Sequence, residues 1–375
     1  MNKENVLSMI SKMSKEDVID LARSTSDVEV LNILAENANY EVRCTVAENK
    51  NTPVELLAVL AQDEVWWVRC AVAENENTSI DVLAMLAQDE KWLVREQVAL
   101  NASTSAETLA VLAKDVDIDV RWAVADNKNI RVETLVMLAQ DEKWRVRSAV
   151  AGNINTPADV LAMLAKDEDI DVRCAVANNR NAPADVLAIL AKDEVIDVRR
   201  AVTKNENTSA DALAMLAKDV DIDVRCAIAE NKNTPVELLA VLAQDEDYWV
   251  RCAVAEKGST TADVLAVLAK DDVYEVRTEV AANGNTSANI LAMLAKDTNF
   301  DVRASVAQNN NTPVETLVML ASDKEWWVRQ AVAGNKNAPI ETLVFLSKDN
   351  NEWVSEAAKE ALKERKEESK TSMER

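Results

Sequence analysis

Apolar and polar residues alternate along the chain in a pattern that returns every 26 residues. The segment 49–74, NKNTPVELLAVLAQDEVWWVRCAVAE, shows one copy of it. An apolar run over 56–61, which includes Val59, predicts an amphipathic helix with a face wide enough to contact neighbours on both sides. Residues 62–64 predict a turn, and a second helix is expected over about 65–73. One copy of the pattern therefore predicts two short helices.

The ends of these helices carry recognisable signals. Thr52, Pro53 and Glu55 predict a helix start with a hydroxyl N-cap, a proline at the first helical position and a capping-box carboxylate. All six prolines of the chain occupy the Pro53 position. Asn75 follows the second helix, where a residue that tolerates the left-handed conformation often ends a helix.

The period extends over nearly the whole chain. An arginine that follows valine recurs at intervals of 26 from Arg43 to Arg329, so thirteen units fill 23–360. Helices of about ten residues are too short to be stable alone and need stacked neighbours. We expect an all-α, right-handed α-solenoid of about thirteen two-helix repeats. Segment 1–22 is expected to form N-terminal capping helices, and 361–375 a charged tail that extends the last helix.

A charged ladder is predicted from the same repeat. An aspartate stands in the turn of twelve units, and the recurring arginine follows six residues later. A buried arginine needs an acceptor, and an aspartate of its own or the adjacent unit supplies one. A phosphate-binding row is disfavoured because each arginine has a carboxylate. The ladder residues considered are Asp63, Arg69, Asp89, Arg95, Asp115, Arg121, Asp141 and Arg147.

The pattern N-x-N-T-P-x-E-x-L-x-x-L-A-x-D-x-x-x-x-V-R-x-A-V-A resembles the leucine-rich repeat variant (LRV) family and is similar to HEAT repeats. The resemblance implies a right-handed superhelix of paired helices and leaves open whether one of each pair is 3₁₀. The founding type of the family carries an N-terminal cysteine cluster for an iron–sulfur centre. This chain lacks that cluster, so no cofactor is expected, and the family has no common catalytic activity.

Composition narrows the possible chemistry. With 42 Lys and Arg against 65 Asp and Glu, the net charge is −23, which disfavours nucleic acid and anionic membranes as partners and favours basic ones. Histidine is absent, so the commonest general base and metal ligand are missing. The first 22 residues have no continuous apolar region, and a cytoplasmic location is expected.

The cysteines give no catalytic or metal site by the same reasoning. All five follow the recurring arginine, so adjacent ones are expected about 8–10 Å apart, as neighbouring helices are. That separation is too wide for a disulfide and does not converge on a metal. We therefore predict no metal site, no catalytic residue and no enzyme activity. The cysteines are Cys44, Cys70, Cys174, Cys226 and Cys252.

Comparison of the units separates two positions of the second helix. The Trp66 position is bulky in twelve of thirteen units, which predicts core or inter-unit packing. Neighbouring helix residues point about 100° apart, so Trp67 is predicted in a different environment. The Trp67 position holds Trp, Asp, Arg and Leu interchangeably, as only a solvent-facing position can. The position of Cys70 lies on the same side and also varies.

These solvent-facing residues form the predicted binding surface, here called the variable stripe. Second helices of solenoids typically line the concave face, and exposed aromatic residues in a row are unusual on a monomer. The stripe joins tryptophan anchors to carboxylates that would attract Lys or Arg. Its members are Trp67, Leu93, Asp119, Trp122, Arg145, Asp171, Asp197, Arg200, Asp223, Trp249, Asp301, Trp327 and Trp353.

The sequence thus predicts a monomeric, non-catalytic protein–protein interaction scaffold that binds a basic or extended polypeptide on its concave face. Two alternatives stay open. One is a HEAT-like enzyme or enzyme accessory with a carboxylate-lined groove. The other is a structural, self-assembling rod, in which the exposed tryptophans would be buried against another copy.

Overall fold

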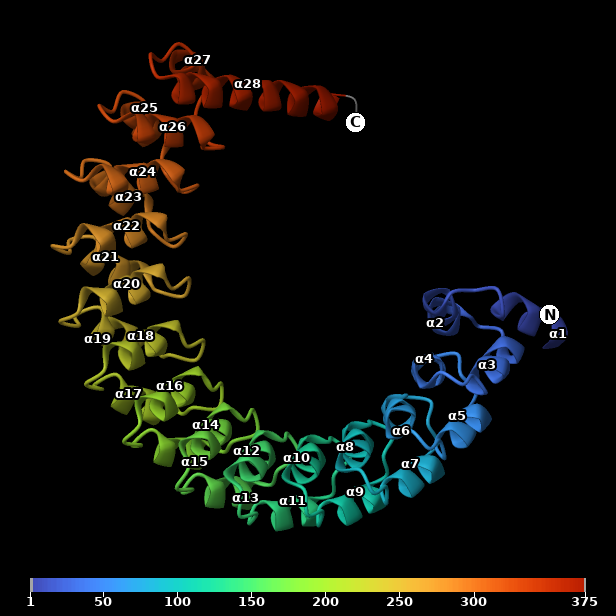
Figure 1. Cartoon of the computed structure of the whole chain (residues 1–375). Coiled ribbons are helices and arrows are strands. Elements are labelled where there is room, and N and C mark those ends of the chain that lie inside the picture. The colour runs from blue at the N-terminus through green and yellow to red at the C-terminus, as the bar shows by residue number, and fades with distance from the viewer. Residues whose placement is uncertain (1–2, 374–375) are drawn as a thin grey trace. The chain divides into compact units, whose positions relative to one another are not determined.

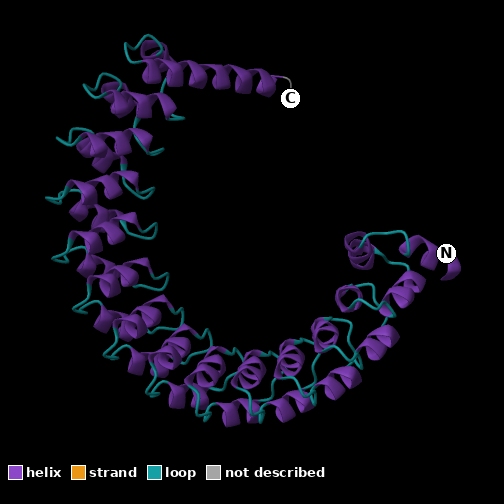
Figure 2. Cartoon of the chain, in the orientation of Figure 1, coloured by secondary structure: helices purple, strands orange, loops and turns teal. Residues whose placement is uncertain are grey.

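The computed structural model describes residues 3–373 as a succession of α-helices with no strand among them (Figures 1 and 2). Two compact units divide the chain at Ala201 and Val202, and helix α16 (Ile196–Lys204) contains the boundary. Both helices of each repeat are α-helices in the described residues, so neither is 3₁₀. The predicted all-α solenoid of helix pairs is confirmed.

The first unit begins with two helices that precede the repeats, followed by the first repeats themselves. Its helices are α1 (Lys3–Ile10), α2 (Lys15–Ser24), α3 (Val28–Ala35), α4 (Tyr40–Glu48), α5 (Val54–Leu60), α6 (Trp66–Glu74), α7 (Ile80–Leu86), α8 (Trp92–Leu100), α9 (Ala106–Leu112), α10 (Ile118–Asp126), α11 (Val132–Leu138), α12 (Trp144–Gly152), α13 (Ala158–Leu164), α14 (Ile170–Asn178) and α15 (Ala184–Leu190).

The second unit continues the helix pairs and ends in one long helix. Its helices are α17 (Ala210–Leu216), α18 (Ile222–Glu230), α19 (Val236–Leu242), α20 (Tyr248–Glu256), α21 (Ala262–Leu268), α22 (Tyr274–Ala282), α23 (Ala288–Leu294), α24 (Phe300–Gln308), α25 (Val314–Leu320), α26 (Trp326–Gly334), α27 (Ile340–Leu346) and α28 (Glu352–Met373). The last of these carries Arg365, whose guanidinium donates to the backbone carbonyls of Lys336 and Ala338, both at 2.6 Å.

The start of the first helix differs from the prediction. Pro53 has φ −62° and ψ 151°, which places it outside the helix as the N-cap, and the helix begins at Val54. The Thr52 hydroxyl does not cap this helix. It is buried and donates to the carbonyl of Val46 at 2.5 Å, so it ties the loop to the preceding second helix. The local capping pattern therefore gave the wrong partner for Thr52.

The end of the second helix also differs from the prediction. Asn75 has φ −68° and ψ 125°, and no described residue has a positive φ. Its buried amide instead donates to two carbonyls of the preceding repeat, Ala47 at 2.6 Å and Asn49 at 3.2 Å. Its side-chain oxygen accepts from the Asn77 backbone N–H. Asparagine recurs here because its side chain joins repeats, and no left-handed turn is present.

The core lies between the two helix layers of each unit. Leu57, Val68 and Val72 are fully buried, and their equivalents are buried through the described array. Adjacent repeats are joined mainly through their second helices, as α6 packs against α4 and α8. Within each unit the second helices lie on the inner side of the curve and the first helices on its outer side (Figure 1).

The first helices are less buried than their apolar pattern suggested. Val59 is 66% exposed, so this part of the predicted apolar face lies largely in solvent. The physical reason is that first helices of adjacent repeats spread apart on the outer side while second helices carry the packing between repeats. Large apolar residues are exposed at this position along both units: Val59, Met85, Val111, Met137, Met163, Ile189, Met215, Val241, Val267, Met293, Met319 and Phe345.

Candidate binding surface on the second helices

The charged ladder connects the second helices of adjacent repeats. The Arg147 guanidinium donates from Nε and Nη2 to the Asp167 carboxylate at 2.6 and 2.8 Å, and from Nη1 to the carbonyl of Asp141 at 2.8 Å. Burial raises the pKa of Asp167, but hydrogen bonds from Arg147 and from the Asp169 backbone outweigh it, so its pKa lies below the usual value. This arginine is therefore committed to the frame.

The same geometry recurs with the aspartate always coming from the next repeat. The sequence left open whether the partner lies in the same repeat or an adjacent one, and the ion pairs join adjacent repeats. The pairs that include the ladder residues are Arg43–Asp63, Arg69–Asp89, Arg95–Asp115, Arg121–Asp141 and Arg147–Asp167. In the second unit the pairs are Arg225–Asp245, Arg251–Asp271, Arg277–Asp297, Arg303–Asp323 and Arg329–Asp349.

Aromatic doublets stand at the start of three second helices. The rings of Trp66 and Trp67 are stacked, with centroids 3.9 Å apart and planes 25° apart, and Trp326 and Trp327 repeat this at 3.8 Å and 23°. The rings of Tyr248 and Trp249 form a third pair, which is tilted, with centroids 4.8 Å apart and planes 32° apart. Each doublet places an exposed indole over a second ring, which makes a broad, rigid aromatic surface.

The sequence left core and inter-unit packing open for the Trp66 position: the core interpretation is wrong, and inter-unit packing stays a prediction. Trp66 is half-exposed, and its equivalents Trp92 and Trp144 are 38% and 44% exposed. Long helical side chains lean toward the helix N-terminus and normally cover the preceding turn. Trp66 is the first residue of α6, so no preceding turn exists, and its ring lies against that of Trp67. The two rings are in contact, although Trp66 is the less exposed of the two.

The residues of the variable stripe face solvent, as their varied chemistry predicted. The more exposed ones are Trp67, Arg145, Asp171, Asp197, Asp223, Trp249, Trp327 and Trp353. The half-buried ones are Leu93, Asp119, Trp122, Arg200 and Asp301. Their role in binding stays a prediction.

In the first unit, three residues of the variable stripe interact with one another. Arg145 on α12 donates to Asp119 on α10 at 2.5 Å, and its guanidinium carbon lies 5.2 Å from the centroid of the Trp122 ring. A cation over an indole face is attracted by the ring quadrupole. Trp122 is thus covered by a neighbour's cation and is not the free anchor that the sequence suggested. We call Asp119, Trp122 and Arg145 the internal arginine cluster.

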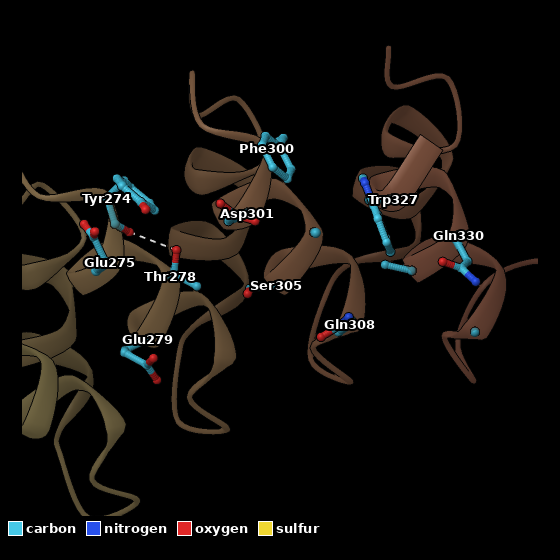
Figure 3. Close-up of a pocket in the computed structure, with 13 residues that line it drawn as sticks. Tyr274, Glu275, Thr278, Glu279, Phe300, Asp301, Ser305, Gln308, Trp327 and Gln330 are labelled. Carbon is cyan, nitrogen blue, oxygen red and sulfur yellow. Dashed lines mark hydrogen bonds between the residues drawn. The ribbon is translucent and has the colours of Figure 1, made fainter. Parts of the chain in front are cut away.

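In the second unit, a cavity of about 910 Å³ opens over α22, α24 and α26 (Figure 3). Tyr274, Phe300 and Trp327 supply aromatic rings to its lining, one from each of three consecutive repeats. Small residues at Ala304 and Gly334 leave the space between them open. The cavity is lined by second helices, and two of its lining residues, Asp301 and Trp327, belong to the variable stripe.

Carboxylates complete the lining of this cavity. Glu275 and Glu279 come from α22, and Asp301 comes from α24 (Figure 3). Burial, and then the nearby charge of Glu256, raise the pKa of Glu279 above its usual value. No lysine or arginine belongs to the described residues that line the cavity. The cavity therefore combines aromatic rings with uncompensated negative charge, a combination that suits an organic cation.

Sequence reasoning found part of this site. It selected Asp301 and Trp327 but missed Tyr274, Phe300 and Glu279. The two rings occupy the position that was assigned to core or inter-unit packing. The sequence alone could have singled out Glu279, because it is the only acidic residue at a position that is alanine in most repeats.

Comparison with known proteins places the repeat in a family. The family model described as "Leucine rich repeat variant" matches residues 40–65, 66–91 and 300–325. Each match is 26 residues long, starts at the first residue of a second helix and keeps the register of the whole array. These three segments are thus similar to leucine rich repeat variant repeats. The resemblance inferred from the repeat pattern is thereby confirmed.

Solved structures share the helical architecture. The chain is 28% identical to a protein titled "a leucine-rich repeat variant with a novel repetitive protein structural motif", with 59% of this chain and 87% of that one covered and a TM-score of 0.46. It is 12% identical to importin beta, with 96% of this chain and 52% of that one covered and a TM-score of 0.29. No curated protein matches the chain.

The cysteines and other metal-ligating side chains of the described residues are spread along the repeats. The five thiols are free and half-buried, and burial together with nearby carboxylates raises the pKa of Cys44 to about 11 and that of Cys70 to about 12. Within residues 3–373, no three metal-ligating side chains come together. No helix of this range is both long and apolar enough to span a membrane.

Proposed function

We propose that the protein is a non-catalytic scaffold whose second-helix surface, on the concave side of each unit, binds a basic or extended polypeptide. The observation that carries this proposal is the set of three aromatic doublets, which expose Trp67, Trp249 and Trp327 at 53%, 59% and 53% on second helices of a strongly acidic chain. Rigid aromatic side chains of this kind dominate the binding energy of protein interfaces.

Charge supports a cationic partner. Asp171, Asp197 and Asp223 lie exposed on the same helix layer, and the whole chain carries a net charge of −23. A surface of one sign speeds the approach of a partner of the opposite sign and suppresses partners of like charge. Ladder arginines such as Arg69, Arg95 and Arg147 do not offset this field at the surface, because each forms an ion pair with an aspartate of the next repeat. A Lys- or Arg-rich segment is the partner that this surface fits.

The test is a binding assay with designed polypeptides. Fluorescent fifteen-residue peptides that differ only in charge, one rich in Lys and Arg, one neutral and one rich in Glu, are titrated with the full chain. We expect the basic peptide to bind most tightly and its affinity to fall as salt rises. The variant Trp67→Ala/Trp249→Ala/Trp327→Ala is expected to lose at least about tenfold in affinity, as interface hot spots do.

A matched control changes the outer surface. Val59→Ser/Val241→Ser/Val267→Ser alters three residues that are 66%, 56% and 57% exposed on the first helices, and it should bind like the wild type. If the tryptophan variant binds the basic peptide unchanged, the proposal fails. If sedimentation shows that the tryptophans hold copies together instead, the self-assembling rod is the better description.

A further inference from the structure

The cavity over α22, α24 and α26 occupies the place that the internal arginine cluster fills in the first unit. Counted along the 26-residue repeat, Asp119, Trp122 and Arg145 of α10 and α12 correspond to Asp301, Ala304 and Trp327 of α24 and α26. The acid is kept, the tryptophan has become alanine, and the arginine has become tryptophan. The second unit thus has the acidic half of the cluster without its cation.

The space that this exchange opens is part of the cavity. Ala304 and Ser305 on α24 and Gly334 on α26 line it, and a β-carbon added at Gly334 would meet nothing within 4 Å. At the Ala304 position two repeats carry a large side chain, Trp122 and Arg200, and most others carry a small one such as Cys70. Glycine also stands at the Gly334 position beside the internal arginine cluster, at Gly152, so the large side chain absent from the cavity is the one that Trp122 supplies there.

The negative charge of Asp301 has no ion pair among the described residues, whereas Asp119 is paired with Arg145. Glu275 and Glu279 add two further carboxylates to the same lining. The ring of Trp327 is backed by Trp326 at 3.8 Å, so one face of the doublet is fixed and the indole edge and outer face are presented to solvent. An entering cation would find both an acid and an aromatic ring.

We propose that this cavity is a side-chain pocket for an arginine of the bound polypeptide, which rests on the proposed function and names its specific anchor. The internal arginine cluster shows the recognition in the same fold, since Arg145 pairs with a carboxylate and lies over an indole. Arginine fits better than lysine, because its planar guanidinium stacks on rings and donates two parallel hydrogen bonds to one carboxylate. The pocket volume of about 910 Å³ also accommodates neighbouring peptide atoms.

The direct test compares three nonapeptides of Gly and Ser that carry one central Arg, Lys or citrulline. Their affinities for the full chain are measured by calorimetry at low salt. We expect the order Arg, then Lys, then citrulline, with arginine at least about tenfold tighter than neutral citrulline. Equal affinities for arginine and citrulline would overturn the proposal.

Filling the pocket provides the matched variants. Ala304→Trp introduces the side chain that Trp122 already supplies at the equivalent position, so the fold tolerates it, and it should abolish the preference for arginine. Ser148→Trp makes the same change at the equivalent position of the first unit and should have no effect. The double variant Ala304→Trp/Trp327→Arg rebuilds the internal cluster and should block binding while Glu275 and Glu279 remain. Arginine binding by that double variant as tight as by the wild type would contradict the assignment.

The opposite exchange tests the same geometry by gain of a site. Trp122→Ala/Arg145→Trp removes the internal arginine cluster, and we expect the arginine peptide to bind with a stoichiometry of two instead of one. A stoichiometry that stays at one would show that the flanking residues Tyr274 and Glu279 are also required, and that the three-residue correspondence is insufficient.

Failure of the pocket and failure of the proposed function are distinguishable. If Trp67→Ala/Trp249→Ala weakens the long basic peptide but Ala304→Trp leaves every affinity unchanged, the scaffold proposal stands and the pocket is rejected. If the arginine nonapeptide binds and Ala304→Trp abolishes it, while the long basic peptide binds no tighter than the nonapeptide, the pocket stands and the extended surface is rejected.

Discussion

Two arginines on helix α12, separated by one residue, are expected to differ sharply in their contribution to stability. The pair Arg147–Asp167 has side chains only 12% and 9% exposed, whereas the pair Arg145–Asp119 is 48% and 29% exposed. Replacing each arginine in turn by methionine keeps a long aliphatic stem and removes the charge. The two variants therefore compare a ladder ion pair with a surface ion pair within one helix.

The magnitudes follow from what each substitution leaves behind. Arg147→Met removes two hydrogen bonds to Asp167 and one each to the carbonyls of Asp141 and Glu142, and leaves Asp167 with the backbone N–H of Asp169 at 2.9 Å. Breaking a buried ion pair by removing one partner costs about 3–5 kcal/mol. Arg145→Met breaks an exposed pair, which is expected to cost at most about 1 kcal/mol.

The assay must be local, because a repeat array need not unfold in one step. Hydrogen exchange followed by mass spectrometry gives an opening free energy for peptides from α12 and α14 separately. We expect exchange from these helices to accelerate strongly in Arg147→Met and little in Arg145→Met. Peptides from α5 and α6, several repeats away, serve as an internal reference.

A second variant tests the reason for the effect. If the cost arises from an uncompensated buried charge, Arg147→Met/Asp167→Leu should recover much of the loss, because both charges are gone. Equal acceleration in Arg145→Met and Arg147→Met would refute the reasoning. So would a double variant that is less stable than Arg147→Met alone, since the ladder would then act by something other than charge pairing.

Three further outcomes are expected. Asn127→Ala should cost about 1–3 kcal/mol, because it removes the Asn127 amide that donates to the buried carbonyl of Ala99 and leaves the carbonyl of Asn101 with only the backbone N–H of Thr104. Hydrogen exchange measures the loss, and Asn129→Ala, whose amide donates to the exposed carbonyl of Ala102, is the mild control. Stability should fall on acidification, because hydrogen bonds from their arginines lower the pKa values of the ladder aspartates in the folded chain. The stability that these carboxylates contribute is present above the unfolded pKa of about 3.9 and is lost as pH falls below that value. A circular dichroism titration follows the loss. Alkylation of Cys70 by iodoacetamide at pH 8 should be far slower than that of an exposed thiol, because burial raises its pKa to about 12; a rate equal to that of free cysteine would contradict this.

The repeat period and the helix pairs could be predicted because they depend on local spacing that recurs many times. The Asp-to-Arg spacing of six residues likewise pointed to a ladder, although the partner of Arg69 is Asp89 in the next repeat and the sequence allowed either repeat. The ambiguity is physical. Spacing within one repeat fixes the backbone contact of Arg69 with the carbonyl of Asp63, while the carboxylate contact depends on how repeats stack.

The errors come from rules that treat a helix as isolated and complete. Asn75 looked like a helix terminator because capping rules consider only adjacent residues, whereas its amide bonds carbonyls 26 and 28 residues earlier. A helical wheel separated Trp66 from Trp67, but both lie in the first turn of α6. Trp66 therefore has no preceding helical turn to pack against, and its ring stacks on that of Trp67. Val59 looked buried because the wheel does not show that the first helices spread apart.

The cavity was the hardest feature to predict, since no single repeat contains it. It needs Glu279 on α22, Ala304 on α24 and Trp327 on α26, three residues at different positions of three consecutive repeats. Each was visible as a departure from its own column of equivalents. What the sequence could not supply was the knowledge that the Trp66 position faces solvent, because that placed Tyr274 and Phe300 outside the core.

The frame and the variable stripe are physically independent, which explains how one fold can carry both an occupied and an open site. Arg147 and Asn153 join their repeats through backbone carbonyls and the recurring aspartate, and none of these hydrogen bonds involves the side chain at 145. The residue at 145 can therefore be arginine there and tryptophan at 327 without disturbing the stacking. Since distant, independent sites contribute additively to stability, exchanging the internal arginine cluster for the cavity residues should change ligand binding while hydrogen exchange of the ladder stays the same.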